Sequence, residues 1–249
     1  MERIENIDFC IRYLATQNGV QADSREAQTL GDKQRLLRAL MNIWQPQALS
    51  EEFLQAQDAE LQLQKAARQP LVPATEVWQG DITRLEVDAI VNAANAQMLG
   101  CFQPLHACID NAIHSAAGLQ LRKECHDIMQ GGLLRTGDAV ITAGYNLPAR
   151  HVIHTVGPIV NTGVPTLTHR LQLAACYVSC LEKAAQNDLH SIAFCCISTG
   201  VFGYPQTEAA EVAIATVREW LAKHSDNEMK VTFCTFKDYD TQLYRNRLS

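Results

Sequence analysis

The sequence contains few charged residues, and its basic residues do not outnumber its acidic ones. Only 19% of the 249 residues are charged, and 21 lysines and arginines stand against 27 aspartates and glutamates. Partners such as nucleic acids and anionic membranes require clustered basic side chains, so the net charge of −6 argues against both. An anionic small molecule is still possible if backbone amides hold it. With 47% hydrophobic residues, the chain is expected to bury a core and to lack long disordered stretches.

Long apolar runs and a secretion signal are also missing. No segment approaches the roughly 18 consecutive apolar residues of a membrane helix. The first residues, Met-Glu-Arg-Ile-Glu-Asn-Ile-Asp, lack the basic start and apolar stretch of a signal peptide. The nine cysteines are an odd number and include the adjacent pair Cys195-Cys196, which indicates free thiols and metal ligands rather than a disulfide framework. We therefore expect a cytoplasmic protein.

Three soft metal donors stand close together after residue 100. Cys101, His106 and Cys108 offer two thiolates and an imidazole, and Gly100 and Pro104 suit a tight loop that turns them inward. Catalytic zinc typically takes three protein ligands and keeps one position open, whereas structural zinc fingers use two separated ligand pairs. The spacing predicts an open zinc site on a loop.

Residues 1–73 carry helical patterns. Apolar residues recur at helical spacing over residues 7–14 and 30–44, and Ser50 stands where a helix N-cap would, ahead of a helix-permissive segment over residues 55–69. We expect an N-terminal helical extension over residues 1–73 that packs on a main domain over residues 74–249.

Residues 74–249 alternate between strand and helix patterns. Strands are expected over residues 74–78, 89–92, 139–143, 151–156, 191–197 and 231–236, and helices over 109–118, 119–129, 167–187, 207–224 and 239–248. This alternation predicts an α/β fold with helices on both faces of a largely parallel sheet. The link over residues 144–149 is short enough for a reverse turn, so the sheet is expected to be mixed.

Ligands of open α/β sheets bind beyond the carboxyl ends of the strands, where three loops stand out. In the first, Asp81 follows Gly80, and it can accept a hydrogen bond from an amino group such as that of adenine or form an Asx turn. The third, residues 198–204, contains glycines and precedes a helix, so its backbone amides can form a nest for phosphate oxygens. Phe202 in this loop either stacks on a sugar or shields the loop.

The second loop contains the metal donors and several other polar residues. Asn95 can both donate to and accept from a sugar hydroxyl, and Asp110 can take a proton from water or a ribose hydroxyl. Taken alone, Asn95 is more often a turn residue and Asp110 a helix cap. His114 is expected in the core, and Cys125 with His126 is a less favoured completion of the zinc shell. The other cysteines are expected to be small buried hydrophobes: Cys10, Cys176, Cys180, Cys195, Cys196 and Cys234.

Together these motifs resemble the macrodomain, the α/β/α fold that binds ADP-ribose. The matching segments are residues 80–83, 87–95, 109–114, 137–142, 152–158 and 197–205. Ordinary macrodomains carry glycines before the aspartate that corresponds to Asp110. The loop with Cys101, His106 and Cys108 instead resembles that of the microbial zinc-dependent macrodomains, which also have a helical N-terminal extension. The resemblance implies a three-layer α/β/α macrodomain with a mixed sheet.

The same resemblance implies a hydrolase that removes mono-ADP-ribose from protein side chains and releases ADP-ribose. It also implies as substrate a lipoyl-carrier protein modified by a sirtuin-type enzyme. Asn95 would position the distal ribose, one zinc ion would be bound beside the anomeric carbon of that sugar, and Asp110 would act in catalysis. The residues implied to contact ADP-ribose are Asp81, Ile82, Asn95, Ser198, Thr199, Gly200, Val201, Phe202 and Phe236.

Cleavage of the glycosidic bond is expected to pass through an oxocarbenium-like state. Zinc either polarises a ribose oxygen or lowers the pKa of a bound water to about 7, and direct contact with ribose assisted by Asp110 is the favoured hypothesis. Three other functions stay open at this point. They are a reader that binds ADP-ribosylated protein without cleaving it, a metal-free hydrolase with a structural zinc, and a phosphatase acting on phosphorylated ADP-ribose.

Overall fold

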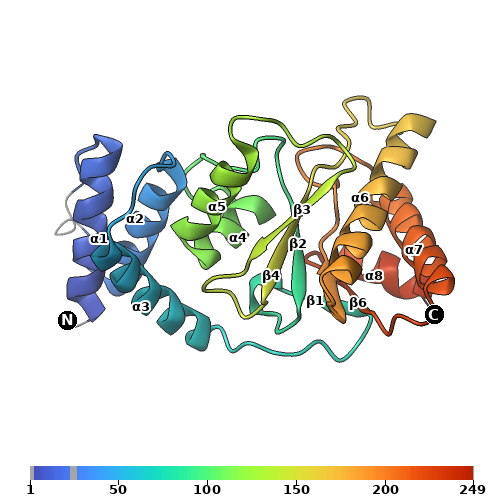
Figure 1. The fold of residues 1–249 in the computed structure, drawn as a ribbon, viewed down its shortest axis with the longest axis horizontal. Coiled ribbons are helices and arrows are strands. Elements are labelled where there is room, and N and C mark those ends of the chain that lie inside the picture. Colours follow the sequence, from blue (N-terminus) through green and yellow to red (C-terminus); the bar gives the residue numbers. More distant parts are fainter. Residues whose placement is uncertain (1–2, 23–26, 249) are drawn as a thin grey trace.

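The chain begins with three helices and continues as an alternation of strands and helices (Figure 1). The structure, a computed structural model, describes residues 3–22 and 27–248. The N-terminal helices are α1 (Arg3–Asn18), α2 (Leu30–Ile43) and α3 (Glu51–Ala67). The strands are β1 (Val77–Gln79), β2 (Ala89–Ala93), β3 (Ala139–Ala143), β4 (His151–Thr155), β5 (Ser191–Phe194) and β6 (Lys230–Thr235). The remaining helices are η1 (Ile82–Arg84), α4 (Ile109–Ala117), α5 (Leu119–Met129), α6 (Leu167–Gln186), α7 (Gln206–Lys223) and α8 (Asp238–Leu248).

The six strands form one mixed sheet in the order β1-β6-β5-β2-β4-β3. The first five of these are mutually parallel, and β3 runs antiparallel to β4. The turn between β3 and β4 closes tightly, since a Cβ on Gly144 would lie 2.0 Å from the carbonyl oxygen of Ala149. The predicted mixed sheet is confirmed, and all five parallel strands end at the same edge.

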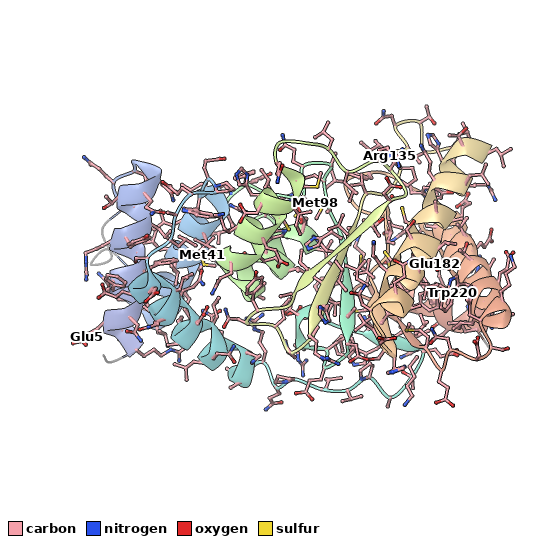
Figure 2. The ribbon with its side chains drawn as sticks, viewed as in Figure 1. Glu5, Met41, Met98, Arg135, Glu182 and Trp220 are labelled. Atoms are coloured by element: carbon pink, nitrogen blue, oxygen red, sulfur yellow. The ribbon has the colours of Figure 1, made fainter. Side chains whose placement is uncertain are left out.

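Helices cover both faces of the sheet, as predicted. Helices α4 and α5 lie on one face, and α6, α7 and α8 lie on the other (Figure 1). Within the second layer the indole N–H of Trp220 on α7 donates to Glu182 on α6 at 2.7 Å (Figure 2). The central strands β2, β4 and β5 are almost wholly buried between these layers, which explains their largely apolar sequences.

The N-terminal helices add a fourth layer, stacked on the outer side of α4 and α5 (Figure 1). They share a separate hydrophobic cluster in which Trp44 and Phe53 are fully buried, and Leu119 of α5 joins it. The predicted cap is confirmed, because the Ser50 hydroxyl accepts from the backbone N–H of Phe53 at 3.2 Å. The domain division between residues 73 and 74 stays a prediction.

Two strands depart from their predicted bounds by three residues at one end. Residues 74–76 are exposed and β1 begins only at Val77, while β5 ends at Phe194 although the apolar run continues to Ile197. Apolar character reports burial, and Ile197 is fully buried without belonging to the ladder. Because β5 ends early, the residues that follow it belong to the loop that leads to the site.

The thiols and the helices agree with two further expectations. All nine cysteines are free. Cys10, Cys176, Cys180, Cys195 and Cys234 are buried, as predicted, while Cys196 is half-buried. Among the residues that the structure describes, no helix combines the length and apolar character needed to cross a bilayer.

Candidate active site

The predicted site residues gather at one edge of the sheet, because they follow strands that are parallel to one another. Asp81 follows β1, Asn95 and the metal donors follow β2, residues 198–202 follow β5, and Phe236 follows β6. The chain thus brings segments from distant parts of the sequence to the edge where α/β proteins bind ligands.

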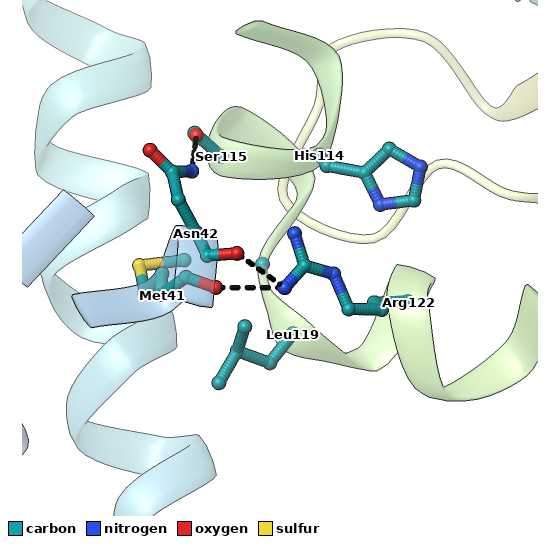
Figure 3. A pocket seen from close by; sticks show the side chains of 7 residues that line it. Met41, Asn42, His114, Ser115, Leu119 and Arg122 are labelled. Atoms are coloured by element: carbon teal, nitrogen blue, oxygen red, sulfur yellow. Dashed lines mark hydrogen bonds between the residues drawn. The ribbon is translucent and has the colours of Figure 1, made fainter. Parts of the chain in front are cut away.

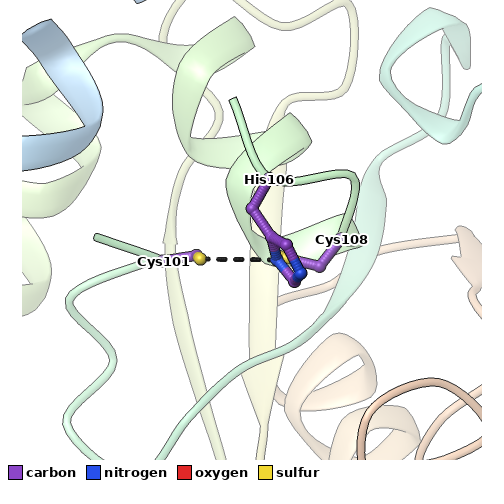
Figure 4. Close-up of side chains that lie close together, drawn as sticks. All are labelled: Cys101, His106 and Cys108. Carbon is purple, nitrogen blue, oxygen red and sulfur yellow. Dashed lines mark hydrogen bonds between the residues drawn. The ribbon is translucent and has the colours of Figure 1, made fainter. Parts of the chain in front are cut away.

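The three metal donors converge (Figure 4). The donor atoms of Cys101, His106 and Cys108 all lie within 4.8 Å of one another, and Cys101 Sγ is 3.6 Å from His106 Nδ1. A tetrahedral zinc with Zn–S near 2.3 Å and Zn–N of about 2.0–2.1 Å has a sulfur–nitrogen edge of about 3.6 Å. The donor set and its spacing therefore fit zinc.

The electrostatics of these donors also suit a cation. Burial raises the pKa of the Cys108 thiol to about 11, and the nearby Cys101 and Asp110 raise it as well, against a hydrogen bond from the Asn111 backbone that lowers it. The anionic forms of these three groups repel one another at short range. A divalent cation relieves such repulsion and favours the deprotonated thiols.

Local backbone geometry turns the loop inward. Gly100 has φ +75°, and a Cβ there would lie 2.8 Å from the His114 ring, so both the angle and the space require glycine. Cys108 is the N-cap of α4, and its sulfur accepts from the backbone N–H of Asn111 at 3.4 Å. The alternative prediction that Asp110 caps this helix is wrong, since Asp110 lies inside the first turn.

Asp110 is held in one orientation by two asparagines. Its side chain accepts from Asn92 Nδ2 at 2.8 Å and from Asn95 Nδ2 at 3.3 Å, and the residue is only 6% exposed. Burial raises the pKa of Asp110 to about 6, although the Asn92 hydrogen bond and the positive Arg122 both lower it. Sequence reasoning missed Asn92, yet a polar residue at the end of an apolar strand signals a buried hydrogen-bond partner.

Asn95 is a turn residue and a site residue at once. Its Oδ1 accepts from the backbone N–H of Gln97 at 3.1 Å, and its Nδ2 also donates to the carbonyl of Gly100 at 3.0 Å. Asn95 therefore ties the start of the metal loop to Asp110. Its Oδ1 keeps a second lone pair for a sugar hydroxyl.

Asp81 forms the Asx turn that was one of its two predicted roles. Its Oδ1 accepts from the backbone N–H of Thr83 at 2.9 Å and from the Thr83 hydroxyl at 2.7 Å. The second carboxylate oxygen receives no hydrogen bond from the described residues. The Ile82 side chain is buried, whereas the Phe236 ring is 78% exposed at the same edge.

The loop after β5 presents free backbone amides. Ser198 has φ +66°, the left-handed conformation that often forms anion-binding nests. The backbone N–H groups of Gly200, Val201 and Phe202 have no acceptor among the described residues, and the Tyr204 N–H closes the loop on the Ser198 carbonyl at 3.0 Å. Helix α7 follows directly, so its N-terminal partial charge favours an anion here.

Comparison with known proteins identifies the family. Residues 91–213 match the Macro domain model. A protein-ADP-ribose hydrolase from Treponema medium is 48% identical over 270 residues, covering 100% of both chains. A protein-ADP-ribose hydrolase from Staphylococcus aureus (strain MSSA476) is 46% identical over 86% of this chain and 84% of its own. This chain belongs to the macrodomain hydrolases.

Other relatives and solved structures agree. An ADP-ribose glycohydrolase from Rattus norvegicus is 50% identical over 69% of this chain and 63% of its own. A variant of the Oceanobacillus iheyensis macrodomain with ADPR superposes with a TM-score of 0.63 at 40% identity, over 69% of this chain and 90% of that one. A Trypanosoma brucei macrodomain gives 0.64 at 28% identity over 93% and 96%. The macrodomain fold inferred from the motifs is confirmed.

Behind the site of this macrodomain hydrolase lie two buried histidines. His114 is 3% exposed, and the described residues offer neither ring nitrogen a hydrogen bond. His154 is fully buried between Asn92, whose Nδ2 is 3.1 Å from Nδ1, and Thr142, whose hydroxyl is 3.0 Å from Nε2. Burial lowers the pKa of His154 to about 3 and that of His114 well below its usual value. The prediction of a core histidine at position 114 is confirmed.

These neutral histidines predict a loss of stability on mild acidification. The pKa of His154 is about 3 in the folded protein and about 6.5 in the unfolded chain, so between these values only the unfolded chain binds the proton. The stabilising contribution of neutral His154 is therefore complete above pH 6.5 and declines below it. Between pH 7 and pH 5 the free energy of unfolding should fall by about 2 kcal/mol for His154 alone. Urea unfolding across this range, with saturating zinc, measures the slope. The His154→Gln variant should show a shallower slope, and an unchanged slope would contradict the assignment.

Proposed function

We propose that this macrodomain hydrolase removes mono-ADP-ribose from modified protein side chains and that its activity depends on one zinc ion held by Cys101, His106 and Cys108. The observation that carries the proposal is the convergence of these donors beside Asp110, at the 3.6 Å spacing of a tetrahedral zinc site. Support comes from relatives named protein-ADP-ribose hydrolase and from a solved macrodomain with ADPR.

The binding roles follow from the free polar groups at the sheet edge. The unengaged oxygen of Asp81 accepts from the adenine amino group, and the exposed ring of Phe236 covers the base. Ile82 contributes through its backbone N–H, because its side chain is buried. The free amides after Ser198 bind the diphosphate, as expected for a nest at a helix N-terminus.

The chemistry is assigned to the residues around the metal loop. Cys101, His106 and Cys108 would hold the zinc, which would supply a Lewis acid milder than that of a three-histidine site because two thiolates would offset its charge. Asn95 positions the distal ribose and fixes Asp110, and Asp110 orients the attacking water and accepts its proton. Water adds to the anomeric carbon, and the protein side chain leaves with the electrons of the broken bond and takes up a proton, so that free ADP-ribose is released.

The proposal is tested by measuring bound metal and ADP-ribose release together. Wild-type protein should carry about one zinc per chain and release free ADP-ribose from mono-ADP-ribosylated protein. Binding of the modified protein without release would favour the reader function, and activity only on phosphorylated ADP-ribose would favour the phosphatase. The proposed substrate, a lipoyl-carrier protein modified by a sirtuin, should be cleaved faster than an unrelated modified protein.

A further inference from the structure

The segment that carries the metal donors contains no helix or strand of its own between residues 100 and 108. We propose that α2 of the N-terminal extension is part of the metal site, with Asn42 as the positioning residue that holds this segment in its metal-binding shape. The inference rests on the proposed zinc site and adds to it a role for the extension.

Asn42 reaches from the end of α2 into the metal loop. It is 1% exposed, and its Oδ1 accepts from the backbone N–H of Leu105 at 2.9 Å, while its Nδ2 donates to the Ser115 hydroxyl of α4 at 3.0 Å. Leu105 has φ +57°, a left-handed conformation that is unfavourable for a side chain of this size. It directly precedes His106. The Asn42 contact therefore stabilises an unfavourable backbone conformation that aims the histidine.

Arg38, one turn earlier on α2, makes a second connection. Its Nη2 and Nε donate to Asn111 Oδ1 at 2.7 and 3.2 Å. The amide of Asn111 in turn donates to the carbonyl of Gln103 at 3.0 Å, and its backbone N–H donates to the Cys108 sulfur. Arg38 thus holds Asn111, whose side chain bonds to the middle of the loop and whose backbone N–H bonds to the last donor.

Arg122 of α5 provides the third connection (Figure 3). Its Nη1 donates to the carbonyl oxygens of Met41, Asn42 and Trp44 at 2.8–3.0 Å, which satisfies carbonyls at the buried C-terminal end of α2. Its guanidinium lies 4.5 Å from the centre of the Phe102 ring, next to the first donor. The same side chain therefore anchors α2 and packs against the metal loop.

The three connections meet the loop at residues 102, 103 and 105, between the first and second donors. Groups that orient metal ligands without touching the metal typically change metal affinity by ~10–100-fold when they are removed. Preorganisation of this kind requires rigid support, and a packed helix end supplies it. The extension is thus expected to lower the free-energy cost of ordering the loop for zinc binding.

The test compares zinc affinity among matched variants of the full chain. Asn42→Ala should weaken zinc binding ~10–100-fold in competition with a chromogenic chelator, and it should alter the absorption spectrum of the Co²⁺-substituted protein. Asn42→Asp keeps an acceptor for the Leu105 N–H and should remain within about threefold of wild type. Asn18→Ala is the control, because Asn18 donates to the Leu40 carbonyl of α2 at 2.9 Å without touching the loop.

Arg38→Met is a second variant in case Asn42→Ala does not fold, and it should weaken zinc binding severalfold while leaving Asn42 in place. Equal zinc affinity in wild type and Asn42→Ala, or equal losses in Asn42→Ala and Asn42→Asp, would overturn the positioning role alone. Wild-type protein that binds no zinc would overturn the proposed metal site and this inference with it.

Discussion

Cys101→Ala is expected to lower kcat/KM for ADP-ribose release by about 10³-fold, because it removes one of the three donors that hold the zinc. Cys101 is a cleaner target than Cys108, since the Cys108 sulfur also caps α4 and its loss would weaken the helix. The measurement is ADP-ribose release from mono-modified protein, with zinc content determined on the same preparation.

Cys10→Ala is the matched control for this variant. Cys10 is a buried thiol of α1, and its removal should change the thermal midpoint without changing zinc content or rate. If Cys101→Ala lost its zinc but kept wild-type activity per folded molecule, the zinc would be structural and the proposed mechanism would be wrong.

Asp110→Asn is expected to reduce kcat by about 10²–10³-fold while KM and the affinity for free ADP-ribose stay within a few-fold of wild type. The substitution keeps the size of the side chain but removes the proton acceptor that Asn92 and Asn95 orient. Single-turnover release separates the chemical step from binding, and calorimetry with ADP-ribose measures affinity directly.

The asparagine variant also places its amide beside the Asn92 amide, so its folding has to be checked by thermal unfolding. Asp127→Asn serves as the control, because Asp127 is an exposed carboxylate that pairs with Lys123 on the surface of α5. A variant at position 110 that bound ADP-ribose far more weakly yet kept kcat would assign Asp110 to binding rather than catalysis.

The secondary structure was largely predictable because its signals are local. The helix α5 and the strand β3 were predicted residue for residue, and Ser50 was identified as a cap from its neighbours alone. The antiparallel partner of β4 followed from the length of the turn that precedes it. After Phe194 the apolar run continues although the strand has ended, because an apolar sequence indicates burial and does not show whether the buried residues pair in a strand.

The candidate site was predictable only as a set of residue types. The donor triplet and the free amides after β5 could be read from short motifs. The partners of those residues could not, because Asn92 lies 18 positions from Asp110 and Asn42 lies 63 positions from Leu105. Hydrogen bonds across such separations leave no periodicity in the sequence. The helix-cap prediction for Asp110 failed for a local reason, since α4 begins one residue before Asp110 and Cys108 is its N-cap.

The sequence alone determined the alternation of strands and helices, the placement of loops at one sheet edge, and the chemistry of Cys101, His106 and Cys108. These depend on short-range spacing and on side-chain type. Only the tertiary structure decided that Asp110 is buried between two asparagines and that the end of α2 supports the metal loop. Such contacts arise when layers far apart in the chain pack together, and each buried polar group then has to find its partner wherever the packing places one.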